Sequence, residues 1–182
     1  RVKGYRNFLN KIWNANNFLI QNSCDFSHIN KPKQINENIN RWIITEFLFV
    51  KENIQKNINN YRFDEAAKNV YRFVWHSFCD WYLELSKTIY YSSNQSSKDE
   101  TRIVSAYVFR EILILLHPFI PFITEEVWLK NKLDKNSKDY LMFASWSEDK
   151  GKTDKSHTEV NKIIDFITSI RSFKNELGVP PG

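Results

Sequence analysis

Three side chains suited to nucleic-acid contact fall on one face of the helix predicted for residues 2–21. A helix advances about 100° per residue, which places these three, Lys11, Asn14 and Phe18, together with Asn7 in a narrow strip opposite the apolar residues. Lysine can meet a phosphate, an asparagine amide can bond a base edge, and phenylalanine can stack on an unpaired base. This strip indicates a surface for single-stranded RNA. The alternative is that Phe18 folds under the polar connection 22–36.

The sequence contains no motif typical of a catalytic site. The four histidines lack the spacing of a metal site, and there is no glycine-rich phosphate loop or G-x-S-x-G turn. Asp80 and Glu84 share a helix face and could mimic a carboxylate pair. However, Glu84 also lies three residues before Lys87, as in ordinary surface ion pairs. We therefore expect no catalytic residue, no metal and no cofactor in this chain.

Composition narrows the class of protein without identifying it. The 182 residues carry a net charge of +5, which suits a polyanionic partner but equally describes a lysine-rich solvated surface. No apolar run approaches the ~20 residues that span a bilayer, so we expect no membrane contact. Cys24 and Cys79 lack nearby partners, which favours free thiols in the cytoplasm. Because the chain starts at Arg1 and its single methionine is Met142, we expect an excised piece of a longer protein.

Apolar residues recur at helical spacing along most of the chain, while Gly and Pro are scarce. This pattern predicts an all-α fold, an antiparallel helical bundle with short connections, and an extended stretch at 141–143. Residues 1–150 would form the bundle, and 151–182 a C-terminal helix and the start of a linker. The predicted helices span 2–21, 37–59, 63–91, 99–116, 124–129 and 156–177.

Several aromatic residues are expected in the core of this bundle rather than on its surface. We expect Trp75, Phe119 and Phe122 to be buried, His117 to cap the helix that it follows, and Thr124 to cap the next one. The longest apolar stripe belongs to the helix predicted at 63–91. Its members are Phe63, Ala66, Ala67, Val70, Val74, Phe78, Trp81, Leu85 and Ile89.

Three segments also carry a family pattern. They are GYRNFLNKIWNA at 4–15, the stretch 61–87 with YRFDEAA and FCDWYLELSK, and LHPFIPFITEEVW at 116–128. In this order and spacing they resemble the anticodon-binding domain of class I valyl-tRNA synthetases. Isoleucyl and leucyl enzymes share the general bundle and a similar proline corner, whereas the Phe-Cys-Asp-Trp-Tyr-Leu-Glu run is more particular to the valyl family. Residues 167–181 resemble the segment leading to that family's C-terminal region.

The resemblance implies a helical bundle of the class I synthetase anticodon-binding type that holds the anticodon loop of a valine tRNA. The family's H-I-G-H and K-M-S-K-S elements, which bind ATP, and its editing domain are absent from these residues. They would be covalently continuous with this chain in a monomeric parent enzyme that uses ATP to attach valine to its tRNA. Carried over by motif position, the anticodon contacts are Lys11, Asn14, Phe18, Leu83 and Glu84.

Charge and position alone add Lys3, Arg6 and Lys87 as phosphate contacts. Simpler interpretations stay open for part of the set, because Glu84 could pair only with Lys87 and Leu83 could be a core residue. Two alternatives for the whole chain also remain: the equivalent domain of an isoleucyl or leucyl enzyme, and a helical protein-interaction module. Protein binding would be nearly independent of salt, whereas RNA binding should weaken steeply as salt rises.

Overall fold

The computed structural model describes residues 2–26, 32–131, 140–146 and 155–178, and within these residues it contains helices and no strand. The predicted all-α bundle is confirmed. The α-helices are α1 (Val2–Gln21), α2 (Asn38–Asn59), α3 (Phe63–Arg72), α4 (Leu83–Tyr90), α5 (Gln95–Leu116), α6 (Pro121–Lys130) and α7 (Lys155–Glu176). A π-helical segment, Phe73–Tyr82, joins α3 to α4, and a 3₁₀ turn at Leu141–Phe143 replaces the expected extended stretch.

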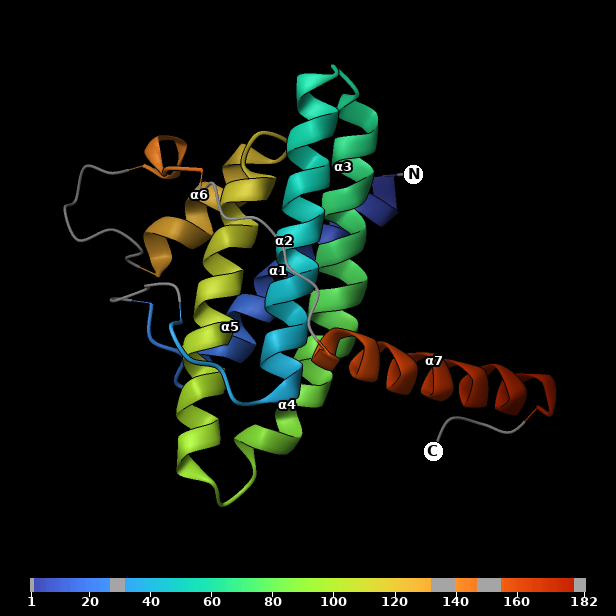
Figure 1. Ribbon diagram of the computed structural model, residues 1–182. Helices are drawn as coiled ribbons and strands as arrows, with labels where there is room; N and C mark the ends of the chain where they lie inside the picture. Colours follow the sequence, from blue (N-terminus) through green and yellow to red (C-terminus); the bar gives the residue numbers. More distant parts are fainter. Residues whose placement is uncertain (1, 27–31, 132–139, 147–154, 179–182) are drawn as a thin grey trace.

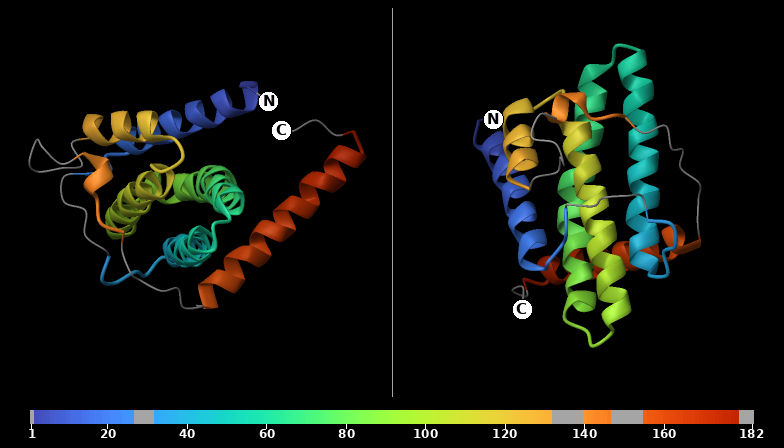
Figure 2. Two further views of the ribbon diagram at one scale, coloured as in Figure 1. Left: turned by 90° about the horizontal axis from the view of Figure 1, so that it is seen from above. Right: turned by 90° about the vertical axis from the view of Figure 1, so that its left-hand side faces the viewer.

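Three long columns form the centre of the molecule: α2, the continuous helix from α3 through α4, and α5. They stand side by side in alternating directions (Figure 1), as the antiparallel prediction requires. Seen from above, α1 and α6 lie along one side of these columns, and α7 runs past another (Figure 2). The largest fully buried side chains fill the space between the columns and α1: Ile12, Leu19, Trp42, Ile43, Phe47, Ile54, Phe73, Phe78, Tyr82, Phe109, Ile112 and Leu113.

The buried face of the long central helix shifts by one residue along its length. A constant 3.6-residue repeat predicts Trp81, Leu85 and Ile89 in the core of its second half. These three are only half-buried, so Trp81 lies at the margin of the core. The residue that follows each of them is buried instead: Tyr82, Ser86 and Tyr90.

The π-helical segment explains this shift. The backbone N–H of Leu83 donates to the carbonyl of Phe78, five residues earlier instead of four. A hydrogen bond that spans five residues instead of four lets the chain accommodate an extra residue, so the apolar pattern after the segment is displaced. The sequence pattern alone contains no mark of this insertion.

A buried polar network stabilises the shifted face. The Tyr82 hydroxyl donates to Asn40 Oδ1 at 2.9 Å and lies 3.0 Å from Ser105 Oγ. The Tyr90 hydroxyl lies 2.7 Å from the same Ser105 oxygen. Since a buried hydroxyl needs a hydrogen-bond partner, this network favours tyrosine at both positions. Burial raises the pKa of both phenols well above the ordinary value, so they remain neutral donors.

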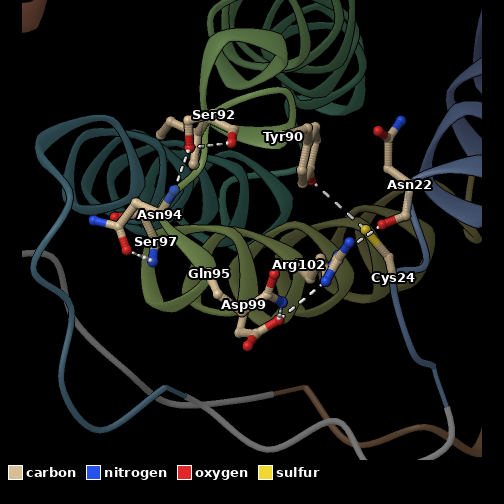
Figure 3. Close-up of polar contacts among 10 residues, drawn as sticks. Asn22, Cys24, Tyr90, Ser92, Asn94, Gln95, Ser97, Asp99 and Arg102 are labelled. Atoms are coloured by element: carbon tan, nitrogen blue, oxygen red, sulfur yellow. Dashed lines mark hydrogen bonds and ion pairs between the residues drawn. The ribbon is translucent and has the colours of Figure 1, made fainter.

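The turn before α5 differs from the prediction, because the helix starts at Gln95 rather than near residue 99. The Asn94 side chain caps it by accepting from the Ser97 backbone N–H at 3.2 Å. Figure 3 shows this cap beside Arg102, whose Nε donates to the Asn22 carbonyl at 2.9 Å. The start of α5 is thereby tied to the end of α1.

The corner before α6 also differs in detail. Pro121 occupies the first turn of the helix, where its missing N–H costs nothing, so α6 begins three residues before Thr124. Thr124 is therefore not the N-cap of α6. Its buried hydroxyl donates to the Ile120 carbonyl. The same hydroxyl lies 2.9 Å from Nδ1 of His117, the residue that follows α5. The predicted burial of Phe122 is wrong, because that position faces solvent and is 92% exposed.

α7 belongs to the bundle only at its beginning. Val160 is buried, Trp42 Nε1 donates to Asn161 Oδ1 at 3.0 Å, and His157 Nε2 lies 2.5 Å from Glu46 Oε1. The rest of the helix projects outward (Figure 1). It ends before Gly178, whose positive φ of 66° suits a helix terminus. The predicted boundary at residues 150–151, and the linker residues 179–182, lie outside the described residues.

Candidate nucleic-acid interface

The flank of α1 that carries the predicted strip faces the beginning of α4. α1 buries Phe8, Ile12 and Leu19 against the bundle. This orientation leaves the strip at the edge of the helix interface, between the core and solvent. The predicted start and end of this helix are confirmed.

An open groove with a cavity volume of about 170 Å³ runs between the two helices. All five residues carried over from the family pattern line it, and so does one of the three proposed phosphate contacts. The complete lining is Lys11, Asn14, Ala15, Phe18, Cys79, Leu83, Glu84 and Lys87. Arg6 is exposed and does not line the groove, and the side chain of Lys3 lies outside the described part of the chain.

Phe18 is half-buried and lines the groove. Behind it lies Tyr90, with the ring centroids 6.0 Å apart. The Lys87 Nζ is 5.9 Å from the Phe18 ring centroid. Phe18 therefore has a fixed support on α4, which is what a stacking platform needs, since its ring need not be ordered by the ligand.

Lys11 is held in place by two partners. Its ammonium pairs with the Asp80 carboxylate and lies 4.4 Å from the Trp75 ring centroid. The other oxygen of Asp80 lies 3.2 Å from His76 Nδ1. Asp80 thus forms an ion pair with Lys11, and it does not form a carboxylate pair with Glu84. Much of the Lys11 charge is compensated before any ligand arrives.

The polar groups on the rim are more available. Glu84 pairs with Lys87 at 2.7 Å, as expected for this spacing, and both side chains remain substantially exposed. Asn14 is exposed and makes no hydrogen bond from its side chain to another described residue. An amide and a carboxylate therefore face solvent on opposite walls of the groove.

The floor of the groove is apolar. Leu83 is 6% exposed, so it contributes to the core and to the groove at once, and Ala15 lies opposite it. Burial raises the pKa of the Cys79 thiol to about 12, so this side chain stays uncharged and behaves as a small apolar residue. The sequence analysis did not identify Ala15 and Cys79 as groove residues. The signal that could have found them is their small size, since small residues on facing helices leave room for a groove.

Two further kinds of site can be assessed among the described residues: metal sites and membrane spans. Among them, no group of three or more His, Cys, Asp or Glu side chains is placed to hold a metal ion. No helix in this part of the chain is both long and apolar enough to cross a membrane.

Comparison with known families identifies the class of domain. A family model described as the anticodon-binding domain of tRNA ligase matches residues 40–182, which is more than half of the chain. The chain belongs to this family. It is also similar to valine–tRNA ligases, being 62% identical over 182 residues to that of Pelagibacter ubique and 42% identical over 182 residues to that of Rhizobium meliloti. Identity to the valine–tRNA ligase of Bartonella quintana is 40% over 183 residues.

These alignments cover the whole chain, including α1, which precedes the family match. They cover only 21%, 19% and 20% of the three relatives, so the chain spans about a fifth of their length. The similarity therefore concerns one part of a much longer protein.

Proposed function

We propose that this chain is the anticodon-recognition module of a valine–tRNA ligase, and that the α1–α4 groove receives bases of the anticodon loop. The observation that carries the proposal is that one groove gathers Lys11, Asn14, Phe18, Leu83 and Glu84. They come from two helices separated by some 60 residues of sequence, and they combine apolar surface with an amide and a carboxylate. This mixture suits a splayed base, which presents two faces and a hydrogen-bonding edge.

The groups on the rim fit the bases that such a tRNA offers. Valine codons require A and C as the second and third anticodon bases. The Asn14 amide can bond adenine through both a donor and an acceptor, and the Glu84 carboxylate can accept from the cytosine amino group. Phe18 and Leu83 supply the surfaces on which the base planes rest.

The ion pair on the rim does not block this use. An exposed pair at this spacing contributes only about 0.2–0.5 kcal/mol, so Lys87 can leave Glu84 at little cost. Lys87 then meets a phosphate while Glu84 accepts from a base. Lys11, held by Asp80, orders the wall of the groove and adds less net charge than its side chain alone suggests.

The remaining functions belong to the longer protein. In a cytoplasmic, monomeric valine–tRNA ligase, this module would hold the anticodon while catalytic and editing domains elsewhere in the polypeptide handle ATP, valine and the acceptor end. The similarity to valine–tRNA ligases favours this assignment over an isoleucyl or leucyl enzyme. The family match favours RNA over a protein partner.

A salt-controlled binding titration tests the proposal. The two ligands are valine tRNA and the same tRNA with G in place of the middle anticodon A. We expect tighter binding of the native anticodon at every salt concentration, and weaker binding of both ligands as salt rises. Equal affinity for the two tRNAs would contradict base reading, and binding of neither would contradict the proposed module.

A further inference from the structure

One side of α7 packs against the bundle, and apolar residues follow each other along it. Val160 is buried, Ile164 packs partly buried against the core, and Ile167 is half-buried. These residues follow each other at the i+4 and i+3 spacing of one helix face. The next residue on this side is Arg171, so the bundle-facing side of α7 changes from apolar to basic where the helix leaves the core.

The exposed Arg171 side chain also contacts the bundle through its guanidinium group. Its guanidinium carbon lies 5.0 Å from the Trp81 ring centroid. Within the described residues, Arg171 has no carboxylate within ion-pair distance. Its charge is therefore uncompensated, in contrast to that of Lys11.

The place of this contact is beside the groove. Trp81 is half-buried at the margin of the core, three residues before Glu84, and residues at that spacing are neighbours on a helix surface. Both views in Figure 2 show the projecting half of α7 running toward the side of the molecule on which α1 lies. The contact of Arg171 with Trp81 ties this part of α7 to the long helix that carries Glu84.

We propose that Arg171, positioned by Trp81, binds a phosphate of the RNA whose bases enter the α1–α4 groove. This inference rests on the proposed function and extends the RNA-binding surface to α7. Cation–π stacking of this kind engages the aromatic ring and leaves guanidinium N–H donors available to a phosphate, which an arginine can bind through two of them at once. The same stacking orders the side chain in advance, so less conformational entropy is lost on binding.

The test compares Arg171→Ala with Lys162→Ala in the 182-residue chain, using the matched and middle-base-changed valine tRNAs over a range of salt. Lys162 is a suitable control because it is an exposed cation on the same helix, nine residues before Arg171 and away from Trp81. We expect Arg171→Ala to lower the affinity for both tRNAs equally, by about tenfold at low salt. The loss should be equal because phosphate contacts carry no sequence information. The salt slope should fall by about 0.7, the value for one phosphate of a single strand.

Two further variants separate positioning from charge. Arg171→Lys should restore the salt slope but only part of the affinity, and Trp81→Leu should reproduce part of the loss with the arginine still present. Circular dichroism of each variant checks that the helices are intact. If Arg171→Ala binds tRNA with the same affinity and salt slope as Lys162→Ala, while the unmodified chain still prefers the native anticodon, the role proposed for Arg171 is wrong and the proposed function stands. If the unmodified chain shows no preference, the proposed function itself fails.

Discussion

The two halves of the long central helix respond differently to the same apolar pattern. In α3 and the first π-helical turn, the 3.6-residue repeat correctly places Ala66, Val70 and Val74 in the core. In α4, the same repeat is one residue out of register. The difference matters for the site, because the shift turns Leu83 toward α1 and places Glu84 on the rim. A local change of helix type thus decides which side chains reach the groove.

The largest effect that distinguishes the two registers is on stability. Tyr82→Ala should lower the free energy of unfolding by about 3–5 kcal/mol, since it empties a fully buried position and leaves Asn40 and Ser105 short of a partner. Trp81→Ala should cost about 1 kcal/mol, because that ring is only half-buried. Urea melts of both variants measure the difference. Equal losses, or a greater loss for Trp81→Ala, would favour the uninterrupted α-helical register.

Most of the fold could be predicted from the sequence, because apolar residues recur at helical spacing along each long amphipathic helix. α1 was placed at its observed bounds, and its polar strip identified one wall of the groove. The second wall came from family resemblance, since neither apolar spacing nor composition marks Leu83 and Glu84 as RNA-facing. The pairing of Lys11 with Asp80 could not be predicted, because it joins residues 69 positions apart and depends on how two helices approach. The π-helical shift was missed for a similar reason: the tertiary hydrogen bonds of Tyr82 stabilise it.

The next effect separates folding from binding on the groove itself. Phe18→Ala should weaken binding of valine tRNA by about 1–3 kcal/mol, the contribution of one stacked base, and leave the helical content unchanged. Tyr91→Ala is the matched control, because Tyr91 is an aromatic residue just after α4 that is 77% exposed and does not line the groove. Binding titrations and circular dichroism of both variants are compared. A loss of helical structure in Phe18→Ala would make Phe18 a structural residue supporting Tyr90.

The smallest expected effect contrasts two similar ion pairs, one in each half of the long helix. Glu65 and Lys68 in α3 are joined at 2.8 Å, and Glu84 and Lys87 in α4 at 2.7 Å, both at i,i+3 spacing. Lys68→Ala and Lys87→Ala should each leave the melting midpoint nearly unchanged, because exposed pairs contribute little to stability. Only Lys87→Ala should also reduce the salt slope of tRNA binding, with the preference for the native anticodon retained. Equal slopes in both variants would show that the α4 pair, like the α3 pair, is an ordinary surface contact and that Lys87 meets no phosphate.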